Sequence, residues 1–578
     1  MVYRFTLSCF LALIFVGIAS AQTDQNVIYG SFFGGNQDDF VSTTNAAASL
    51  GETEWLLTGL TLSSNFWTSD DAFQVQSNVV FGGTAFITRF DASGMPVYST
   101  YFGGSTNMSD SPSIAVSPNG DKYCLGGTTQ SIDFPVTADA YNTVFEGDRS
   151  GFVSCFGDDN QMLWSTFLGS SDYDGVSDLF IAEDGIYVSG FTEDPNLGTP
   201  GTFAPDFPDN LELCAFISKF DHEGELIWLS YLFGPEAFPG IREIETSPDG
   251  SRIYIYAWAS DGSIPVTPGA HQDSFGGFLD GGLLCFSAAD GDLLWATYFG
   301  GEQMELANEM SVGPDGSVCI SGRTESDNQI ATPGSHQEER AGQEDWYIAK
   351  FTADGENVWG TYYGGEQAES VPSLSFLEGS LYLTGNTTSV SGLTFGNPFE
   401  PELSEGSRAS LMAKFDQDQG ELVWATYIGA ENQTCAPATR HTPISGGKFA
   451  FFGSTLGSSL CPSYITDDAF QSSYPGGDLS IWYGILQENT LSVSDSDAPQ
   501  SARLFPNPAS EEVYIDLPDV LFSAMDVQVF DLSGRLVLSV DNLNQGGALN
   551  ISALGNGIYL LRASANRKMY TGKLTVTR

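Results

Sequence analysis

The sequence predicts an all-β protein: a seven-bladed β-propeller closed by an N-terminal strand, followed by a small C-terminal β-sandwich. Three observations support this expectation. A phrase of aromatic residues and glycines recurs seven times, each period contains the same four strand signals, and the end of the chain has a different strand pattern. The 578 residues also include 65 Gly but only 21 Lys and Arg, which is typical of many turns and few charged helical surfaces.

The recurring phrase is represented by "LLWATYFGGEQ", which begins at Leu293. On an ideal strand Trp295 and Tyr298 point to opposite faces, so each can pack against an adjoining blade, and Gly300 and Gly301 let the chain bend. The copies lie 64 to 69 residues apart, and a fixed period indicates a repeat architecture. The first aromatic residues of the "TYFGG" part and its variants are Phe32, Tyr101, Phe167, Tyr231, Tyr298, Tyr362 and Tyr427.

Each period reads as four short strands, which we name A to D in chain order. Strands A and B are joined by a tight turn such as "SPDGS" ending at Ser251, because Gly accepts the positive φ that this turn requires. A long B–C loop leads to strand C, and a second tight turn leads to strand D, which is the phrase itself. One such sheet cannot bury both faces alone, so we expect the sheets to stack radially.

The two ends of the repeat region complement each other. Residues 27–35 form a D strand without its own A, B and C strands, and residues 478–487 form a C strand without a following D strand. We expect these segments to pair, because a linear array would leave both half-sheets with exposed edges.

The remaining segments set the domain boundaries. Residues 1–21 combine Arg4, a short apolar run and the small residues Ala19-Ser20-Ala21, which is the pattern of a secretory signal peptide. A membrane anchor is the alternative, but the run is short for a bilayer span, and no other transmembrane segment is expected. We expect the propeller over 22–490, a linker over 491–501 and the second domain over 502–578.

The charge of the chain limits its partners. The net charge is −52, yet the segment from Ser501 onward has seven acidic and seven basic residues, so the propeller carries the acidity. Such a surface repels phosphate groups, which argues against nucleic acid and anionic membranes as partners. Export permits disulfides, and the candidate pairs are Cys124 with Cys155 and Cys435 with Cys461.

The phrases "WATYFGG", "SPDGS", "SGRT" and the Phe-Asp of strand C resemble bacterial β-propeller repeats of the SBBP type, found mostly in exported proteins. The resemblance covers about 27–487. It implies a shared scaffold and no particular reaction. The seventh copy, with Ile428-Gly429-Ala430, lacks the double glycine of the pattern.

The tail resembles the C-terminal sorting domain of type IX secretion substrates, with an immunoglobulin-like β-sandwich fold. That resemblance implies recognition by the type IX secretion machinery, passage through the periplasm and delivery to the cell surface or the medium. A small accessory β-domain is the alternative. The matching positions are Pro506, Asn507, Pro508, Asp531, Gly534, Arg535, Gly557, Tyr559, Gly572 and Lys573.

Candidate binding residues lie in the D–A loops, just after each phrase. Strand parity places the D–A and B–C loops on one face, and binding residues concentrate on loops held by a rigid scaffold. The binding candidates are Asp38, Asp39, Glu302 and Glu366. No cofactor is certain, but Ca²⁺ prefers several oxygen ligands, and the best candidate site is Asp172, Asp174 and Asp178. Solvated turns, or hydrogen bonds between loops, are the alternative roles of these acids.

Catalytic motifs are absent from the sequence, and no catalytic residue is assigned. His271-Gln272 and His336-Gln337 recur at the same place as Phe73-Gln74 and Phe470-Gln471, which indicates a packing position in the B–C loop. The leading hypothesis is an exported, non-enzymatic propeller that binds a glycan, a protein or another extracellular ligand. The alternative is a secreted polysaccharide hydrolase or lyase that uses carboxylates on the long-loop face.

Overall fold

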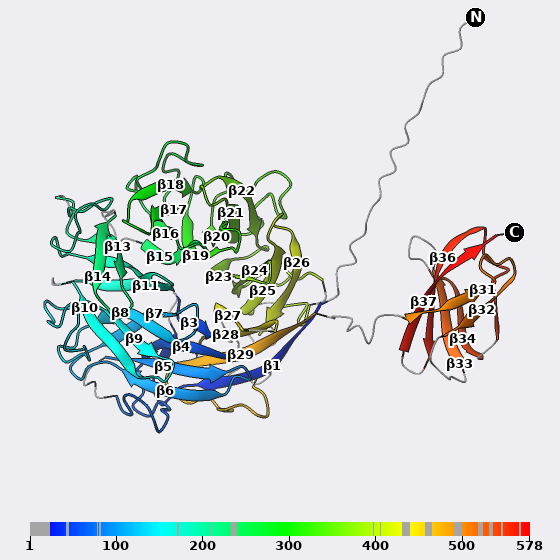
Figure 1. Cartoon of the computed structure of the whole chain (residues 1–578), viewed down its shortest axis with the longest axis horizontal. Coiled ribbons are helices and arrows are strands. Elements are labelled where there is room, and N and C mark those ends of the chain that lie inside the picture. Colours follow the sequence, from blue (N-terminus) through cyan, green and yellow to red (C-terminus); the bar gives the residue numbers. More distant parts are fainter. Residues whose placement is uncertain are drawn as a thin grey trace, which may run out of the picture. The chain divides into compact units, whose positions relative to one another are not determined.

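The structure is a computed structural model of the whole chain (Figure 1). It describes residues 23–577 except 42–44, 52, 78, 80–81, 170–172, 210, 233–239, 397, 405, 430–439, 445, 457–464, 491–499, 518–523, 531–535, 545–546 and 566–567. The expected signal peptide and the candidate pair Cys435 and Cys461 lie outside the described residues. The chain divides into two compact units, one from Gln22 to Thr490 and one that contains Leu491–Arg578.

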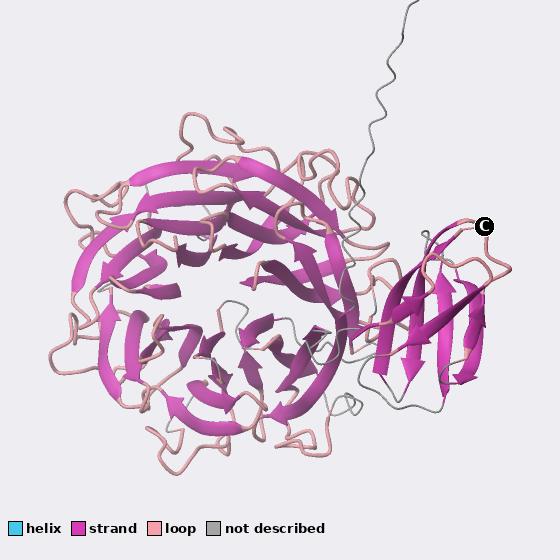
Figure 2. Cartoon of the chain, turned by 45° about the vertical axis from the view of Figure 1, so that its right-hand side comes forward, coloured by secondary structure: helices cyan, strands magenta, loops and turns pink. Residues whose placement is uncertain are grey.

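All regular secondary structure in the described residues is β-strand (Figure 2), so the all-β expectation is confirmed. Within these residues no helix is long and apolar enough to cross a bilayer. The first unit contains seven antiparallel sheets, six of four strands and one of five. Figure 1 shows them around a common centre, a propeller-like arrangement.

We number the sheets 1 to 7 in the order of their A strands. The A strands lie innermost (Figure 1): β2 (Asp39–Val41) and β3 (Ala47–Leu50) in sheet 1, then β7 (Ser109–Val116), β11 (Gly175–Ala182), β15 (Gly240–Thr246), β19 (Glu305–Val312), β23 (Glu369–Leu377) and β27 (Arg440–Ile444). The B strands are β4 (Glu54–Thr61), β8 (Lys122–Thr129), β12 (Gly185–Thr192), β16 (Arg252–Ala259), β20 (Val318–Thr324), β24 (Ser380–Thr387) and β28 (Lys448–Leu456).

The C and D strands complete each sheet toward the outside. The C strands are β5 (Thr84–Asp91), β9 (Ser150–Gly157), β13 (Cys214–Phe220), β17 (Asp280–Ser287), β21 (Asp345–Phe351), β25 (Ala409–Asp416) and β29 (Leu479–Thr490). The D strands of sheets 1 to 6 are β6 (Pro96–Phe102), β10 (Met162–Leu168), β14 (Leu226–Tyr231), β18 (Leu293–Phe299), β22 (Asn357–Tyr363) and β26 (Leu422–Ile428), and the D strand of sheet 7 is β1 (Thr23–Phe33).

The predicted pairing of the two chain ends of this unit is confirmed. Strand β1 runs antiparallel to β29, with Phe33 opposite Ile481 and Val27 opposite Leu486. Sheet 7 therefore takes its A, B and C strands from the end of the repeat region and its D strand from the beginning.

Seven apolar clusters lie between consecutive sheets, and the seventh joins sheet 7 to sheet 1. Tyr298 packs in the cluster between sheets 3 and 4, and Trp295 packs against the cluster between sheets 4 and 5. The two aromatic residues of the phrase thus face opposite neighbours, as predicted from their spacing. Burial of large apolar side chains is the dominant favourable term in folding, so these clusters hold the sheets together.

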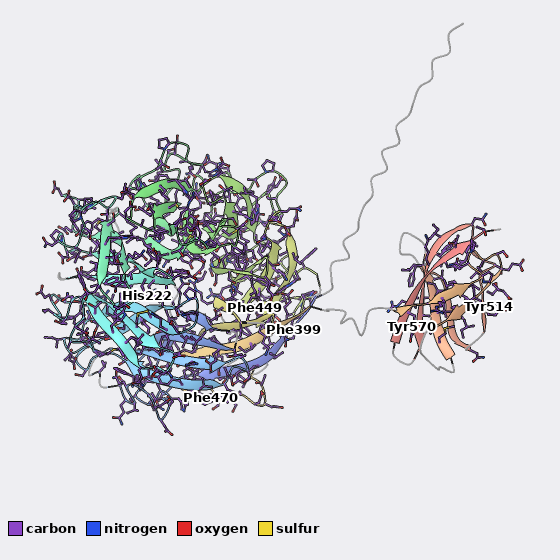
Figure 3. All side chains as sticks on the ribbon, viewed as in Figure 1. His222, Phe399, Phe449, Phe470, Tyr514 and Tyr570 are labelled. Carbon is purple, nitrogen blue, oxygen red and sulfur yellow. A yellow bond between two sulfur atoms is a disulfide. The ribbon has the colours of Figure 1, made fainter. Side chains whose placement is uncertain are left out.

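The tryptophans of the phrase also make a directional contact with the next sheet. The indole Nε1 of Trp295 donates to the Ala353 carbonyl at 3.0 Å, in the C–D turn of sheet 5. Trp164 and Trp359 donate in the same way to the carbonyls of His222, labelled in Figure 3, and Gln417. Each of these Trp residues therefore links two sheets.

The residues before the B–C loop glutamines are packing residues, as expected. His271 stacks on Phe299 at a ring-centroid distance of 6.2 Å, and His336 contacts Tyr363 at 5.9 Å. Phe470, labelled in Figure 3, contacts Phe33 at 6.1 Å. Burial lowers the pKa values of both histidines, which favours their neutral forms.

One of the two candidate disulfides is present. Cys124 on β8 and Cys155 on β9 are bonded across adjacent strands. Among the described residues Cys285 and Cys319 are free and buried, and Cys214 is also buried. Burial raises the pKa values of the Cys214 and Cys285 thiols to about 11 and about 12, so both stay protonated at neutral pH.

The second unit consists of two small sheets around one apolar core. One sheet has the strand order β30-β37-β36-β33-β34 and the other the order β31-β32-β35. The strands are β30 (Gln500–Ser501), β31 (Arg503–Phe505), β32 (Glu512–Asp516), β33 (Ala524–Phe530), β34 (Leu536–Asn544), β35 (Ala548–Asn550), β36 (Gly557–Ala565) and β37 (Lys568–Val576). Tyr570, labelled in Figure 3, lies in this core.

Candidate functional site: the D–A loops and the central cavity

The glycine pair of the phrase places its two backbone amides on fixed partners. The Gly300 amide donates to the Gln272 side chain in the B–C loop at 2.9 Å, and the Gly301 amide donates to Glu305 at 2.6 Å. A Cβ on Gly300 would lie 2.6 Å from the Glu305 carboxylate. The glycines are therefore needed for the close approach of backbone and side chains.

A buried acid four residues after the second glycine holds each of three D–A loops. Glu369 accepts the Gly365 amide at 3.1 Å and the hydroxyls of Thr387 and Ser389 at 2.7 and 2.6 Å. Asp39 and Glu305 make the corresponding bonds to Gly35 and Gly301. Burial raises the pKa of Glu369 to about 7 and that of Asp39 to about 6, although these hydrogen bonds oppose the rise. These acids fasten the D–A loop to the end of strand B.

The four predicted binding residues fall into two groups. Asp39 is buried in this loop contact, and Asp38 accepts the amides of Asp478 and Leu479 at 2.5 and 3.0 Å, which ties it to the start of β29. Glu302 and Glu366 are exposed. The structure does not bring the four together into one pocket.

The predicted metal ligands also have separate surroundings. Asp172 lies outside the described residues. Asp174 accepts the Thr192 hydroxyl at 2.6 Å at the end of strand B, whereas Asp178 accepts from Ser113 at 2.6 Å near the centre of the unit. In the part of the chain that the structure describes, no group of three His, Cys, Asp or Glu side chains could hold a metal ion.

Polar residues occupy corresponding positions on the inner strands of sheets 2 to 7 and just before β3 in sheet 1. In sheets 2 to 6 the polar residue follows a register shift of the A strand, and such bulges re-aim side chains. We call the set the central ring: Asn45, Ser113, Asp178, Glu243, Glu309, Ser373 and Arg440.

Side chains of the central ring contact one another across sheets. The Asn45 amide donates to Asp178 at 3.1 Å and to Glu243 at 3.2 Å, although sheets 1 and 4 are not neighbours. Arg440 of sheet 7 forms an ion pair with Glu309 of sheet 5. Residues that are far apart in the sequence therefore converge at the centre.

Two acids of the central ring, Asp178 and Glu243, also bind the backbone of the following sheet. Asp178 accepts the Ile244 amide at 2.9 Å, Glu243 accepts the Met310 amide, and Glu245, two residues further along β15, accepts the Val312 amide at 2.8 Å. Each carboxylate thus satisfies a backbone donor that the next inner strand presents.

Burial dominates the electrostatics of this region. Asp178, Glu243, Glu309 and Arg440 are at most 7% exposed. Desolvation raises the pKa of Asp178 to about 6 and that of Glu245 to about 8, and it raises that of Glu243 together with the charge of Asp178. Burial lowers the pKa of Arg440 to about 9. Strongly shifted groups around a cavity mark a candidate functional site.

A cavity of about 350 Å³ adjoins the central ring. Its walls begin at ring residues such as Asn45, Glu243 and Arg440, and they continue one to four residues along the inner strands, toward the A–B turns. His441 also lines it and shares hydrogen bonds with Ser375 at 2.6 Å and Thr384 at 2.8 Å.

The arrangement offers two chemical possibilities. Asp178 and Glu243 hydrogen-bond the same Asn45 nitrogen, so two carboxyl groups with raised pKa values lie close together. Such pairs perform acid and base chemistry in glycosidases. Both carboxyl groups, however, also accept backbone amides, which gives them a role in joining the sheets and in lining a polar binding site.

Asp178 is among the candidates predicted from the sequence, whereas Asn45, Glu243, Glu309 and Arg440 are not. Their common position could have been found by aligning the A strands on the repeat period, because successive members are 64 to 68 residues apart. The sequence could not show that these positions follow bulges and face one cavity.

The C-terminal motifs occupy defined places in the second unit. The Asn507 side chain, between Pro506 and Pro508, donates to the Lys573 carbonyl at 2.6 Å and accepts the Thr575 amide at 2.8 Å. Gly557 begins β36, where the Tyr559 hydroxyl donates to Gly555 at 3.0 Å, and Leu561 pairs with Gly572 on β37. Asp531, Gly534 and Arg535 lie outside the described residues.

Three solved structures that resemble this chain are distant from it. Hydrazine synthase of Kuenenia stuttgartiensis is 12% identical over 67% of this chain and 94% of that chain, with a TM-score of 0.35. The endosialidase of phage phi92 is 10% identical over 96% and 88%, with a TM-score of 0.37. Acylaminoacyl peptidase of Pyrococcus horikoshii is 11% identical over 84% and 59%, with a TM-score of 0.35. Sequence identities and TM-scores this low give no basis for assigning a function to this chain.

No curated protein matches the chain in sequence. The family model of the secretion system C-terminal sorting domain matches residues 503–577. This match covers the motifs from Pro506 to Lys573 and confirms the expectation for the tail. Residues 503–577 are therefore a type IX secretion sorting domain, which directs this protein to the cell surface or the extracellular space.

Proposed function

We propose that this chain is an exported, non-enzymatic binding protein. Its sorting domain, over 502–578 after a linker over 491–501, would deliver a seven-bladed β-propeller of SBBP-type repeats over 22–490. The pairing of β1 with β29, and the seven clusters between consecutive sheets, support a closed propeller. Enclosed by the inner strands, the central cavity is the binding site.

One observation carries the choice of binding over catalysis. Asp178 and Glu243 of the central ring accept backbone amides of the next sheet, and Glu369 accepts a backbone amide of its own D–A loop. A nucleophile or a general base needs a carboxylate that is open to the substrate. Carboxylates that hold the sheets together suit a rigid, polar binding site better.

A second candidate function has one observation in its favour. Asp178 and Glu243 converge on Asn45 with raised pKa values, and a protonated carboxyl beside an ionised one is the arrangement of a glycoside hydrolase. Under this alternative the protein would cleave a polysaccharide with these two side chains.

The test uses the chain from Gln22 to Arg578. We expect saturable binding of an extracellular ligand, with no release of reducing ends or unsaturated sugars from a polysaccharide panel. The variants Asp178→Asn and Glu243→Gln would be assayed beside it, with Glu356→Gln, an exposed acid in the C–D turn of sheet 5, as the control. Turnover that is lost in either ring variant, but not in the control, would refute the binding proposal and support the hydrolase.

A further inference from the structure

Arg440 has buried donors without partners. The residue is 3% exposed, and it forms its ion pair with Glu309 through Nη1. Its Nε and Nη2 groups have no hydrogen-bond partner, and Arg440 lines the central cavity. A buried donor that makes no hydrogen bond destabilises the folded state, and more so when it is charged. This side of the guanidinium has the fork geometry that matches a carboxylate.

The same cavity carries an excess of acceptors on its other walls. Glu243, Glu245 and Glu309 line it, and Asp178 lies beside them on Asn45. A carboxylate has about four acceptor sites, so one bond to a backbone amide leaves capacity for a further donor. The ring therefore presents three acids and one arginine, with Glu245 adding a further acid on the cavity wall.

We propose that the central cavity binds a small zwitterion, a free α-amino acid, with its carboxylate on Nε and Nη2 of Arg440 and its ammonium facing Glu243 and Glu245. This inference rests on the proposed binding function and names its ligand class. A plain cation would leave the Arg440 donors unsatisfied and would be repelled by them. A plain anion such as a sugar acid would satisfy Arg440 but would add negative charge beside the acids.

The size of the cavity agrees with this ligand class. Ligand pockets usually measure about 300 to 1,000 Å³, and the central cavity, at about 350 Å³, is at the lower end. It suits one small molecule rather than a polymer. The wall between Arg440 and the A–B turns includes small side chains such as Ala47, Ala115 and Ser311, which leave the space open.

The binding test is isothermal titration of the chain from Gln22 to Arg578. The probes are glycine, L-alanine, L-serine, L-glutamate and L-lysine. Acetate, which carries only the carboxylate, and ethylamine, which carries only the ammonium, serve as half-ligands. D-glucuronate serves as a plain sugar acid. We expect 1:1 binding of at least one amino acid, at least about tenfold tighter than either half-ligand. Binding of glucuronate without any amino acid, or binding of no amino acid, would overturn the inference.

Three variants locate the site. Arg440→Met removes the carboxylate fork and should weaken binding about 100-fold. Glu356→Gln, an exposed acid in the C–D turn of sheet 5, is the control with unchanged affinity. Because Arg440→Met leaves Glu309 without its partner, Ala115→Leu serves as a second variant, which fills the cavity and leaves every charge in place. Unchanged amino-acid affinity in Ala115→Leu, or in a folded Arg440→Met protein, would refute the site.

Failure of the amino-acid site can be distinguished from failure of the proposed binding function. A glycan or protein ligand whose affinity is unaffected by Arg440→Met and Ala115→Leu, with no amino-acid binding, would keep the binding function and refute the amino-acid site. Polysaccharide turnover that depends on Glu243, with amino-acid binding intact, would refute the non-enzymatic function and leave this site supported.

Discussion

Single acidic residues in this chain differ in role over very short distances. Glu366 is exposed, whereas Glu369, three residues later, is buried under the D–A loop. The Gly365 amide and two hydroxyl groups hold Glu369 in place. An acid so buried is harder to ionise in the folded protein than in the unfolded chain, so its titration is coupled to folding.

The sign of this coupling follows from the raised pKa of Glu369, about 7 against an ordinary value of 4.5. Between these values the folded protein retains a proton that the unfolded chain releases, so stability falls as the pH rises and levels off above about 7. The free energy of unfolding should decrease less between pH 5 and pH 8 in Glu369→Gln than in the unmodified protein. We expect the difference to be about 2 to 3 kcal/mol. Urea unfolding at both pH values measures it.

The matched control is Glu366→Gln, on the same loop but exposed. The free energy of unfolding of this variant should depend on pH in the same way as that of the unmodified protein. If Glu369→Gln keeps the full decline in unfolding free energy between pH 5 and pH 8, the raised pKa is not the cause.

At the scale of the element, the outer D strand has one common irregularity. Its register shifts one residue before the Trp or Tyr of the phrase in all seven sheets. A bulge on an edge strand discourages pairing with another molecule. The bulged residues are exposed aliphatic side chains: Ile28, Val97, Leu163, Ile227, Leu294, Val358 and Val423.

Beside this bulge the aromatic residue packs on a glycine of the next sheet. Gly355 has φ +84°, and a Cβ there would lie 2.8 Å from the Trp295 ring. Gly316 in the same sheet has φ +79°, but a Cβ there would meet only Ala353 at 3.7 Å. The two glycines therefore share the backbone requirement and differ in the contact with tryptophan.

We expect Gly316→Ala to cost about 1 kcal/mol of unfolding free energy, because Ala is strained at positive φ. Gly355→Ala should cost about 2 to 4 kcal/mol, because the methyl group also displaces Trp295. Chemical denaturation followed by tryptophan fluorescence compares them. Equal losses in the two variants would mean that the Trp295 contact contributes nothing to stability.

At the scale of the whole molecule, sheet 7 differs from the other sheets in how it accepts the tryptophan of the preceding sheet. Its C strand, β29, and its D strand, β1, come from opposite ends of the unit and are not joined by a C–D turn. The tryptophan of sheet 6 therefore cannot donate to a carbonyl of such a turn. Instead Trp424 donates to the Glu488 carboxylate at 3.2 Å, which also accepts Lys414 at 2.8 Å and Tyr382 at 2.5 Å. Glu488 is 4% exposed.

Removal of this acceptor should weaken the packing of sheet 7 against sheet 6. Glu488→Ala leaves the Lys414 charge and two further donors without a partner, and breaking a buried pair in this way costs about 3 to 5 kcal/mol. Glu488→Gln keeps an acceptor oxygen and should cost less. Thermal unfolding of both variants tests this, and a Glu488→Ala protein as stable as the unmodified one would contradict the role of Glu488 in joining sheets 6 and 7.

The sequence by itself determined the parts that depend on local patterns. Neighbouring residues contain the phrase that recurs from Phe32 to Tyr427, the tight turns with Gly and the sorting motif at Pro506-Asn507-Pro508. They also show a lone D strand at the start of the repeat region and a lone C strand at its end, from which the pairing of β1 with β29 is predicted. Strand periodicity and turn chemistry act over a few residues, so they can be read without the fold.

Only the tertiary structure decided which acids do what. Glu302 and Glu305 cannot be told apart by composition, yet the loop turns one to solvent and buries the other. Bulges of the inner strands aim Asp178, Glu243 and Glu309 toward the centre, where Asn45 and Arg440 arrive from distant repeats. These contacts exist only once all seven sheets have packed, because no short segment contains more than one of the partners.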